Sequence, residues 1–215
     1  MLALLLLACE QTGTQPFAGT KMSDYFAFEG ERTNEYNNED TEVDYKLVVQ
    51  KKSQTTQVDD REVATMEYTN GNTGEVFGSV QWSGITSEAV YVHGYTLGAT
   101  GTLVTFDPPI SITDDDDAMR VGDTVETETT DSDGNAHTYV STLVEGVATC
   151  AATANDDFAQ CVHMTIDDGD GDATTGPLFT GDFIFVASWG AVFQTIPGWD
   201  TEWELTNMEY NPSEE

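Results

Sequence analysis

Apolar residues recur at every second position along most of this chain, and this spacing constrains the fold more than any other feature. Tyr45, Leu47 and Val49 alternate with Lys46, Val48 and Gln50, and the run that contains Phe183 and Phe185 repeats the pattern near the other end. Successive side chains of a β-strand point to opposite faces, so a period of two predicts half-buried strands. Many of these positions hold β-branched or aromatic residues, which are typical of strands.

The runs are short and are separated by turn signals such as Asn70-Gly71 and Asp133-Gly134. Strands at this spacing favour an all-β, antiparallel barrel or half-barrel, with a β-sandwich as the alternative. Only residues 114–119 and 156–160 are candidates for a short helix, and Gly190 offers a break in the longest run. The predicted strands, about eleven, cover residues 32–38, 44–51, 63–69, 75–82, 88–95, 102–107, 121–129, 136–145, 160–166, 182–195 and 201–209.

The first nine residues have the features of a secretory signal. The apolar run before Cys9 is far shorter than the roughly 20 residues that span a bilayer. Leu6-Leu7-Ala8-Cys9 resembles the lipobox of bacterial lipoproteins, in which the cysteine becomes the lipidated first residue of the mature chain. An ordinary cleaved signal is the alternative. We therefore predict an extracytoplasmic protein that is held in the cell envelope by a lipid on Cys9.

This interpretation divides the chain into four parts. Residues 1–8 form the signal, and residues 9–23 form the lipidated cysteine and a polar tether with little to pack. As a flexible coil, about 14 residues would reach roughly 20 Å. Residues 24–211 form a single β domain, and residues 212–215 form a tail.

The charge of the chain excludes several partners. Asp and Glu number 39 against 7 Lys and Arg, which gives a formal net charge of −32, and all seven basic residues lie within the first 120 positions. A phosphate backbone or an anionic membrane surface would be repelled, so the chain should not bind nucleic acid, and membrane attachment needs the lipid. Divalent cations are the partner class that the charge favours, and solubility is the other explanation for it.

Two cysteines remain besides Cys9. Cys150 and Cys161 are separated by a short segment, in a protein predicted to reach an oxidising compartment. We expect a structural disulfide between them, worth roughly 3 kcal/mol through loop closure.

An acidic, glycine-rich segment is the candidate metal site. Asp168, Asp170 and Asp172 have the alternate spacing of a calcium loop, and Asp167 could add a ligand. The match to an EF-hand is incomplete, because Ala173 stands where the glycine belongs and no helices flank the segment. A solvated acidic turn is the alternative to a calcium site.

Aromatic residues supply the other candidate ligand contacts. Tyr91, His93 and Tyr95 are expected to share one face of a strand, as part of the core or as the wall of a pocket. Trp199 lies in a predicted turn and is the tryptophan expected to be exposed, where it could stack on a glycan. Motifs for α/β-hydrolases, phosphate loops, dinucleotide binding and zinc proteases are all missing from the sequence.

Residues 24–36 resemble the opening of a group of uncharacterised bacterial lipoproteins. Their pattern is roughly Tyr-Phe-Pro-Leu, a glycine, and then Trp-x-Tyr entering the first strand. Gly30 and Tyr36 match it, while Ala27, Phe28 and Asn34 stand for the proline, the leucine and the tryptophan. The resemblance implies an envelope lipoprotein of β-rich fold and implies no activity.

These observations favour a non-enzymatic envelope lipoprotein that binds a ligand, a glycan or a protein partner, or that has a structural role, with calcium as a candidate stabiliser. The first alternative is a half-barrel carrier of a lipid or another hydrophobic ligand, lined by the strand from Tyr91 to Tyr95. The second is a hydrolase that uses paired carboxylates, whose signature is a distance in space rather than a sequence motif.

Overall fold

The computed structural model describes residues 23–26, 30–38, 45–52, 56–58, 61–84, 89–114, 120–153, 156–169, 177–187, 189–196 and 199–211. These residues form thirteen strands that join in one sheet, and every pairing is antiparallel. The all-β, antiparallel prediction is therefore confirmed.

The sheet closes into a barrel of twelve strands. β1 (Glu31–Asn37) pairs with β2 (Leu47–Lys51) on one side and with β13 (Trp199–Asn211) on the other. β2 also pairs with β4 (Arg61–Asn70), which completes the ring. A closed ring leaves none of its strands with an unpaired edge. The short β3 (Thr56–Val58) lies outside the ring and pairs with the start of β4.

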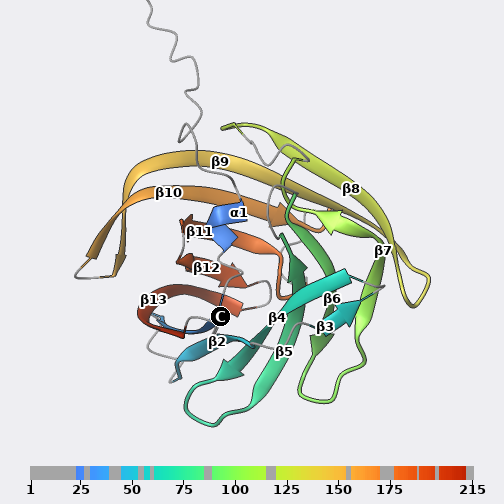
Figure 1. The fold of residues 1–215 in the computed structure, drawn as a ribbon, viewed down its shortest axis with the longest axis horizontal. Helices are drawn as coiled ribbons and strands as arrows, with labels where there is room; N and C mark the ends of the chain where they lie inside the picture. Colours follow the sequence, from blue (N-terminus) through green and yellow to red (C-terminus); the bar gives the residue numbers. More distant parts are fainter. Residues whose placement is uncertain are drawn as a thin grey trace, which may run out of the picture.

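The rest of the ring follows the order of the sequence, each strand pairing with the next. Two of its strands, β9 and β10, form a long curved hairpin that arches over the barrel (Figure 1). The remaining strands are β5 (Val76–Ser83), β6 (Tyr91–Leu97), β7 (Val104–Ser111), β8 (Thr124–Asp131), β9 (Ala136–Thr153), β10 (Asp156–Asp167), β11 (Gly181–Val186) and β12 (Gly190–Ile196).

Most strand positions agree with the predicted runs, and the exceptions are informative. The long run does break, because β11 ends at Val186 and β12 begins at Gly190, whose φ is 83°. The helix candidate at residues 156–160 is wrong, since these residues open β10. β3 was missed, because three residues are too few to show a period.

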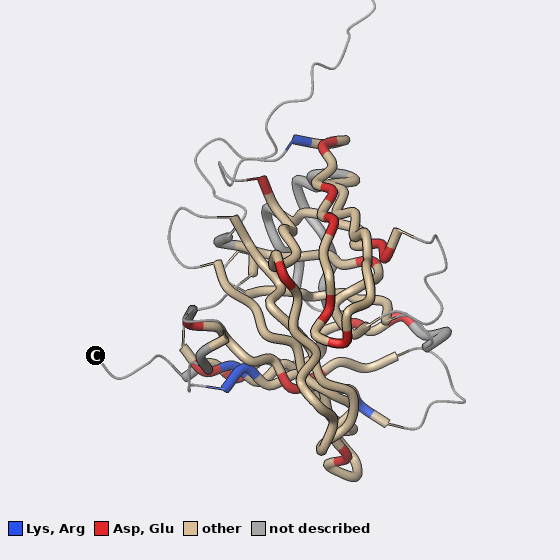
Figure 2. Tube along the Cα trace, turned by 90° about the vertical axis from the view of Figure 1, so that its right-hand side faces the viewer, with Lys and Arg blue, Asp and Glu red and all other residues tan. Residues whose placement is uncertain are grey.

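The barrel wall separates an apolar interior from an acidic exterior. In β2, for example, Leu47 and Val49 are buried and Gln50 is exposed. Figure 2 shows Asp and Glu distributed along the strands that face the viewer, with Lys and Arg at few places. Within the described residues, no helix has the length and apolar character needed to cross a membrane.

One turn of helix fills part of the interior. α1 (Ser23–Phe26) lies beside β11 and β12 (Figure 1), and Tyr25 and Phe26 are 1% and 3% exposed. The Phe26 ring lies 4.4 Å from that of Phe185 and 5.7 Å from that of Trp82. Eight strands enclose only enough space for side chains, so a barrel of twelve needs additional filling of this kind.

Candidate ligand-binding site

The interior is tightly packed along the arc from β6 to β9. Here Tyr95, Phe106, His137 and Tyr139 form an aromatic cluster with Phe179, which lies in the segment just before β11. Ring centroids lie 5.9 Å apart for Phe106 and Phe179, 5.6 Å for Phe106 and Tyr139, and 5.3 Å for Tyr139 and Phe179. Tilted and edge-on rings at these distances pack favourably, and they fill this side of the barrel.

The opposite arc of the ring encloses a cavity. Its empty volume is about 560 Å³, a figure that includes the open solvent at its mouth. Strands β1, β2, β4, β5, β11 and β12 and helix α1 contribute its walls, which are mainly aromatic and aliphatic. The lining residues are Phe26, Arg32, Asn34, Tyr36, Val49, Lys51, Met66, Tyr68, Trp82, Phe183, Phe185, Trp189, Gly190, Ala191 and Gln194.

Three buried polar atoms on this wall have no hydrogen-bond partner among the described residues. They are Oδ1 of Asn34, Nε1 of Trp82 and Nε2 of Gln194, in residues that are 8%, 4% and 1% exposed. A buried donor or acceptor without a partner costs about 1–3 kcal/mol. Such groups on a cavity wall are suited to a ligand that supplies the missing partners.

Two cations belong to the same wall. Arg32 in β1 and Lys51 in β2 are directly opposite each other in the ladder, so their side chains lie on one face of the sheet. Lys51 is 8% exposed, and its Nζ donates to the carbonyl oxygen of Gly30 at 2.5 Å. The guanidinium of Arg32 lies 4.6 Å from the ring centroid of Tyr210. None of the lining residues is acidic.

Two tyrosines complete the wall as neutral groups. Tyr36 Oη donates to the carbonyl oxygen of Ala191 at 2.7 Å and accepts from Nδ2 of Asn34 at 3.1 Å. Burial raises the pKa of both Tyr36 and Tyr68 well above the usual tyrosine value. The phenols therefore stay protonated, and the cations are the charged groups of the lining.

The expectation that Tyr91, His93 and Tyr95 share one face is wrong, because a β-bulge interrupts the alternation. Val92 is opposite Trp82 and Tyr95 is opposite Val80, so both point to the core although they are three residues apart. His93 is the extra residue of the bulge, and its Nε2 lies 2.6 Å from Oγ of Ser83.

None of these three residues lines the cavity; Tyr95 belongs to the aromatic cluster instead. Trp199 opens β13 rather than lying in a turn, and its side chain lies outside the described residues. Trp189, in contrast, lines the cavity. Sequence reasoning missed the cations. A signal was available in the alternation. Arg32 lies an even number of residues from the buried Tyr36, and Lys51 an even number from the buried Leu47, so each occupies an inward position where an apolar residue is expected.

The candidate calcium loop falls largely outside the described part of the chain. Asp170 and Asp172 are not described, while Asp167 is exposed and its Oδ1 accepts from the backbone N–H of Gly169 at 2.7 Å. Asp168 is half-buried at the end of β10. The described residues contain no group of three or more side chains suited to a metal. The calcium site stays a prediction.

The cysteine predictions also remain untested. Cys9 lies outside the described residues, as does the side chain of Cys150, while Cys161 is fully buried in β10. The predicted loop between Cys150 and Cys161 is the end of the β9–β10 hairpin. In this ladder Cys150 is opposite Phe158 and Cys161 is opposite Val147.

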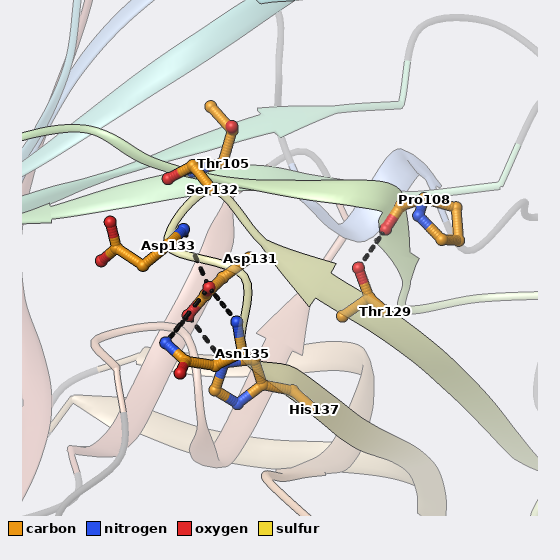
Figure 3. Close-up of polar contacts among 8 residues, drawn as sticks. All are labelled: Thr105, Pro108, Thr129, Asp131, Ser132, Asp133, Asn135 and His137. Atoms are coloured by element: carbon orange, nitrogen blue, oxygen red, sulfur yellow. Dashed lines mark hydrogen bonds and ion pairs between the residues drawn. The ribbon is translucent and has the colours of Figure 1, made fainter.

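The turn between β8 and β9, which Asp133-Gly134 predicts, is built around Asp131 (Figure 3). Its carboxylate accepts from the side-chain amide of Asn135 at 3.0 Å, from the His137 ring at 2.9 Å, and from the backbone N–H groups of Asp133 and Asn135. These bonds, led by that from the Asn135 side chain, lower the pKa of Asp131 far below its usual value. They satisfy the carboxylate within the turn.

A scan against protein-family models and searches of curated proteins and of solved structures find no match for this chain.

Proposed function

We propose that this protein is an envelope lipoprotein whose barrel binds a small hydrophobic ligand in the cavity between α1, β1, β2, β4, β5, β11 and β12. The observation that carries the proposal is a cavity with three buried polar atoms on an otherwise largely apolar wall. Ligand sites commonly combine apolar walls with a few placed polar groups that fix orientation.

The packed arc of the same barrel supports a binding role over a purely structural one. There the aromatic cluster fills the interior with rings that contact one another. A cavity forfeits such contacts and destabilises the fold. Unfilled space together with unpartnered polar atoms is a cost to stability that ligand binding would explain.

The proposed location, in the cell envelope and anchored by a lipid, rests on the sequence. The lipobox-like residues Leu6-Leu7-Ala8-Cys9 and the polar segment after them support a lipid anchor with a tether. A lipid on Cys9 would hold the barrel near a membrane, where hydrophobic ligands are found. Envelope scaffolding without a ligand is the outcome if the binding test fails.

The test uses a neutral hydrophobic dye, N-phenyl-1-naphthylamine, whose fluorescence rises in apolar surroundings. We expect saturable binding that dodecan-1-ol displaces. Ala191→Leu places extra bulk in the cavity, and the strain of about 1–3 kcal/mol that overpacking causes should weaken dye binding roughly tenfold.

Ala187→Leu is the matched control, because Ala187 packs against the core without lining the cavity. It should leave dye binding unchanged. Failure of the folded protein to bind the dye, or binding that both leucine variants affect equally, would overturn the proposal.

A further inference from the structure

The protein places part of its scarce positive charge on the cavity wall, where Lys51 is buried and Arg32 is half-buried. Acids outnumber bases by 39 to 7, yet Arg32 and Lys51 both line the cavity. Lysine and arginine are among the residue types least often buried. Like charges on directly opposite residues of a ladder repel each other, so an anion bound between them is attracted by both.

The two cations are held in place by the chain itself. Gly30 fixes the Lys51 ammonium through its carbonyl oxygen, while Met208 and Tyr210 flank the Arg32 guanidinium, whose Nη1 lies 3.8 Å from the Met208 sulfur. A site whose groups are already ordered loses less entropy on binding. The planar guanidinium suits a carboxylate, which it can bind through two parallel hydrogen bonds.

Two of the three unpartnered polar atoms are also donors. Nε1 of Trp82 and Nε2 of Gln194 carry N–H groups on the cavity wall, in residues that are 4% and 1% exposed. Carboxylate oxygens are acceptors only, so the donors of this wall match them. None of the cavity's lining residues is an acid that would repel a carboxylate.

We infer that the ligand is an amphipathic carboxylate of the fatty-acid type, with its head group at Arg32 and Lys51 and its apolar tail along the aromatic and aliphatic wall. This inference rests on the proposed function and adds the ligand class. Lys51 ends β2 and Arg32 is the second residue of the antiparallel β1, so both lie at the same end of this strand pair, whereas Val49 and Tyr36 lie farther from that end. The head group would therefore lie near the ends of the strands and the tail farther inside.

The test compares three bromine-tagged ligands that share a dodecyl chain: a carboxylate, a primary alcohol and a trimethylammonium. Bromine quenches tryptophan fluorescence at short range, and Trp82 and Trp189 line the cavity. A hydrogen bond to a charged group contributes about 1.5–3 kcal/mol, so the carboxylate should bind roughly 10- to 150-fold more tightly than the alcohol. The ammonium should bind most weakly.

Arg32→Met and Lys51→Met should each reduce the preference for the carboxylate and leave the affinity for the alcohol nearly unchanged. Lys52→Met is the matched control: Lys52 is the next residue, pairs with Glu67 at 2.7 Å, and does not line the cavity. It removes the same charge and should keep the preference intact.

The outcomes separate the two proposals. Equal binding of carboxylate and alcohol would overturn the inference and keep the proposed function, whereas no quenching by any of the three would overturn both. An equal loss of preference in Lys51→Met and Lys52→Met would assign it to net charge and overturn the assigned site. The comparison of ligands on the unaltered protein decides the matter even if a cavity variant does not fold.

Discussion

The two arcs of the barrel interior are built on the same alternation of side chains but are filled in opposite ways. From β6 to β9, inward positions include Tyr95, Phe106 and Tyr139, whose rings pack against one another and against Phe179. On β1, β2 and β12, inward positions include Arg32, Asn34, Lys51 and Gln194, and a cavity lies between them. Buried polar atoms that lack a partner cost free energy, and those of Asn34, Trp82 and Gln194 lie on the cavity arc. This arc is therefore the part of the fold in which we propose that stability is given up for binding.

Truncating one phenylalanine in each arc should give the largest contrast. Phe179 is fully buried and contacts the rings of Tyr95, Phe106 and Tyr139, so Phe179→Ala should lower the free energy of unfolding by about 3–5 kcal/mol. Phe183 stacks on Phe185 but also borders the cavity, where it meets open space, so Phe183→Ala should cost less. Urea unfolding measures both.

Ligand binding should show the reverse order. Phe183→Ala alters the cavity wall and should weaken dye binding, while Phe179→Ala should leave it unchanged in protein that is still folded. Equal losses of stability in the two variants would mean that the arcs are packed alike, and the contrast between them would be lost.

The sequence predicts the strands well because alternation is a local property. The run from 182 to 195 and its break at Gly190 could be identified without knowledge of any neighbour. Closure of the barrel could not be predicted in this way, because it depends on the pairing of β2 with β4 and of β1 with β13, and β1 and β13 are far apart in the chain.

The candidate site was harder to predict for the same reason. Tyr95 changes face because of a bulge, and a bulge is defined only by the register with β5 and β7. Arg32 and Lys51 become neighbours only once β1 and β2 are aligned, so their joint place on the wall is a property of the pairing rather than of either strand.

Two buried glutamines provide a second, smaller test of the contrast. Gln194 lines the cavity and its Nε2 has no partner in the described part of the structure, so Gln194→Met should raise the free energy of unfolding by about 1 kcal/mol. The same variant should weaken carboxylate binding, because it removes a donor from the wall. Thermal melts and tryptophan quenching measure the two effects.

Gln81 is the matched control away from the cavity. Its Nε2 donates to Oγ of Ser79 at 3.2 Å, while its Oε1 has no partner among the described residues. Gln81→Met loses one hydrogen bond and one unpartnered atom, so its stability should change little and its ligand binding should not change. A gain in stability with full binding in Gln194→Met would show that this glutamine does not contact the ligand.

The smallest effect should come from Asp131, in the turn next to the packed arc. Its pKa in the folded protein is far below the usual value of about 3.9, because hydrogen bonds from Asn135 and His137 favour the carboxylate. Because the pKa of Asp131 is lower in the folded than in the unfolded protein, its carboxylate stabilises the fold at any pH above the usual pKa. This stabilisation is lost as the pH falls through the folded-state pKa. Asp131→Asn should therefore lower the free energy of unfolding at neutral pH, and the difference from the unaltered protein should shrink in acid.

Solvent near this turn screens the interaction and keeps the effect small. Asp133→Asn removes the same charge from the same turn, but the Asp133 carboxylate points away from Asp131 (Figure 3), so it should show no comparable pH dependence. Urea unfolding of both variants at neutral and acidic pH makes the comparison. Neither variant should change ligand binding, because the turn adjoins the aromatic cluster through His137 and does not contribute to the cavity wall. Altered binding in Asp131→Asn would show that the two arcs are coupled.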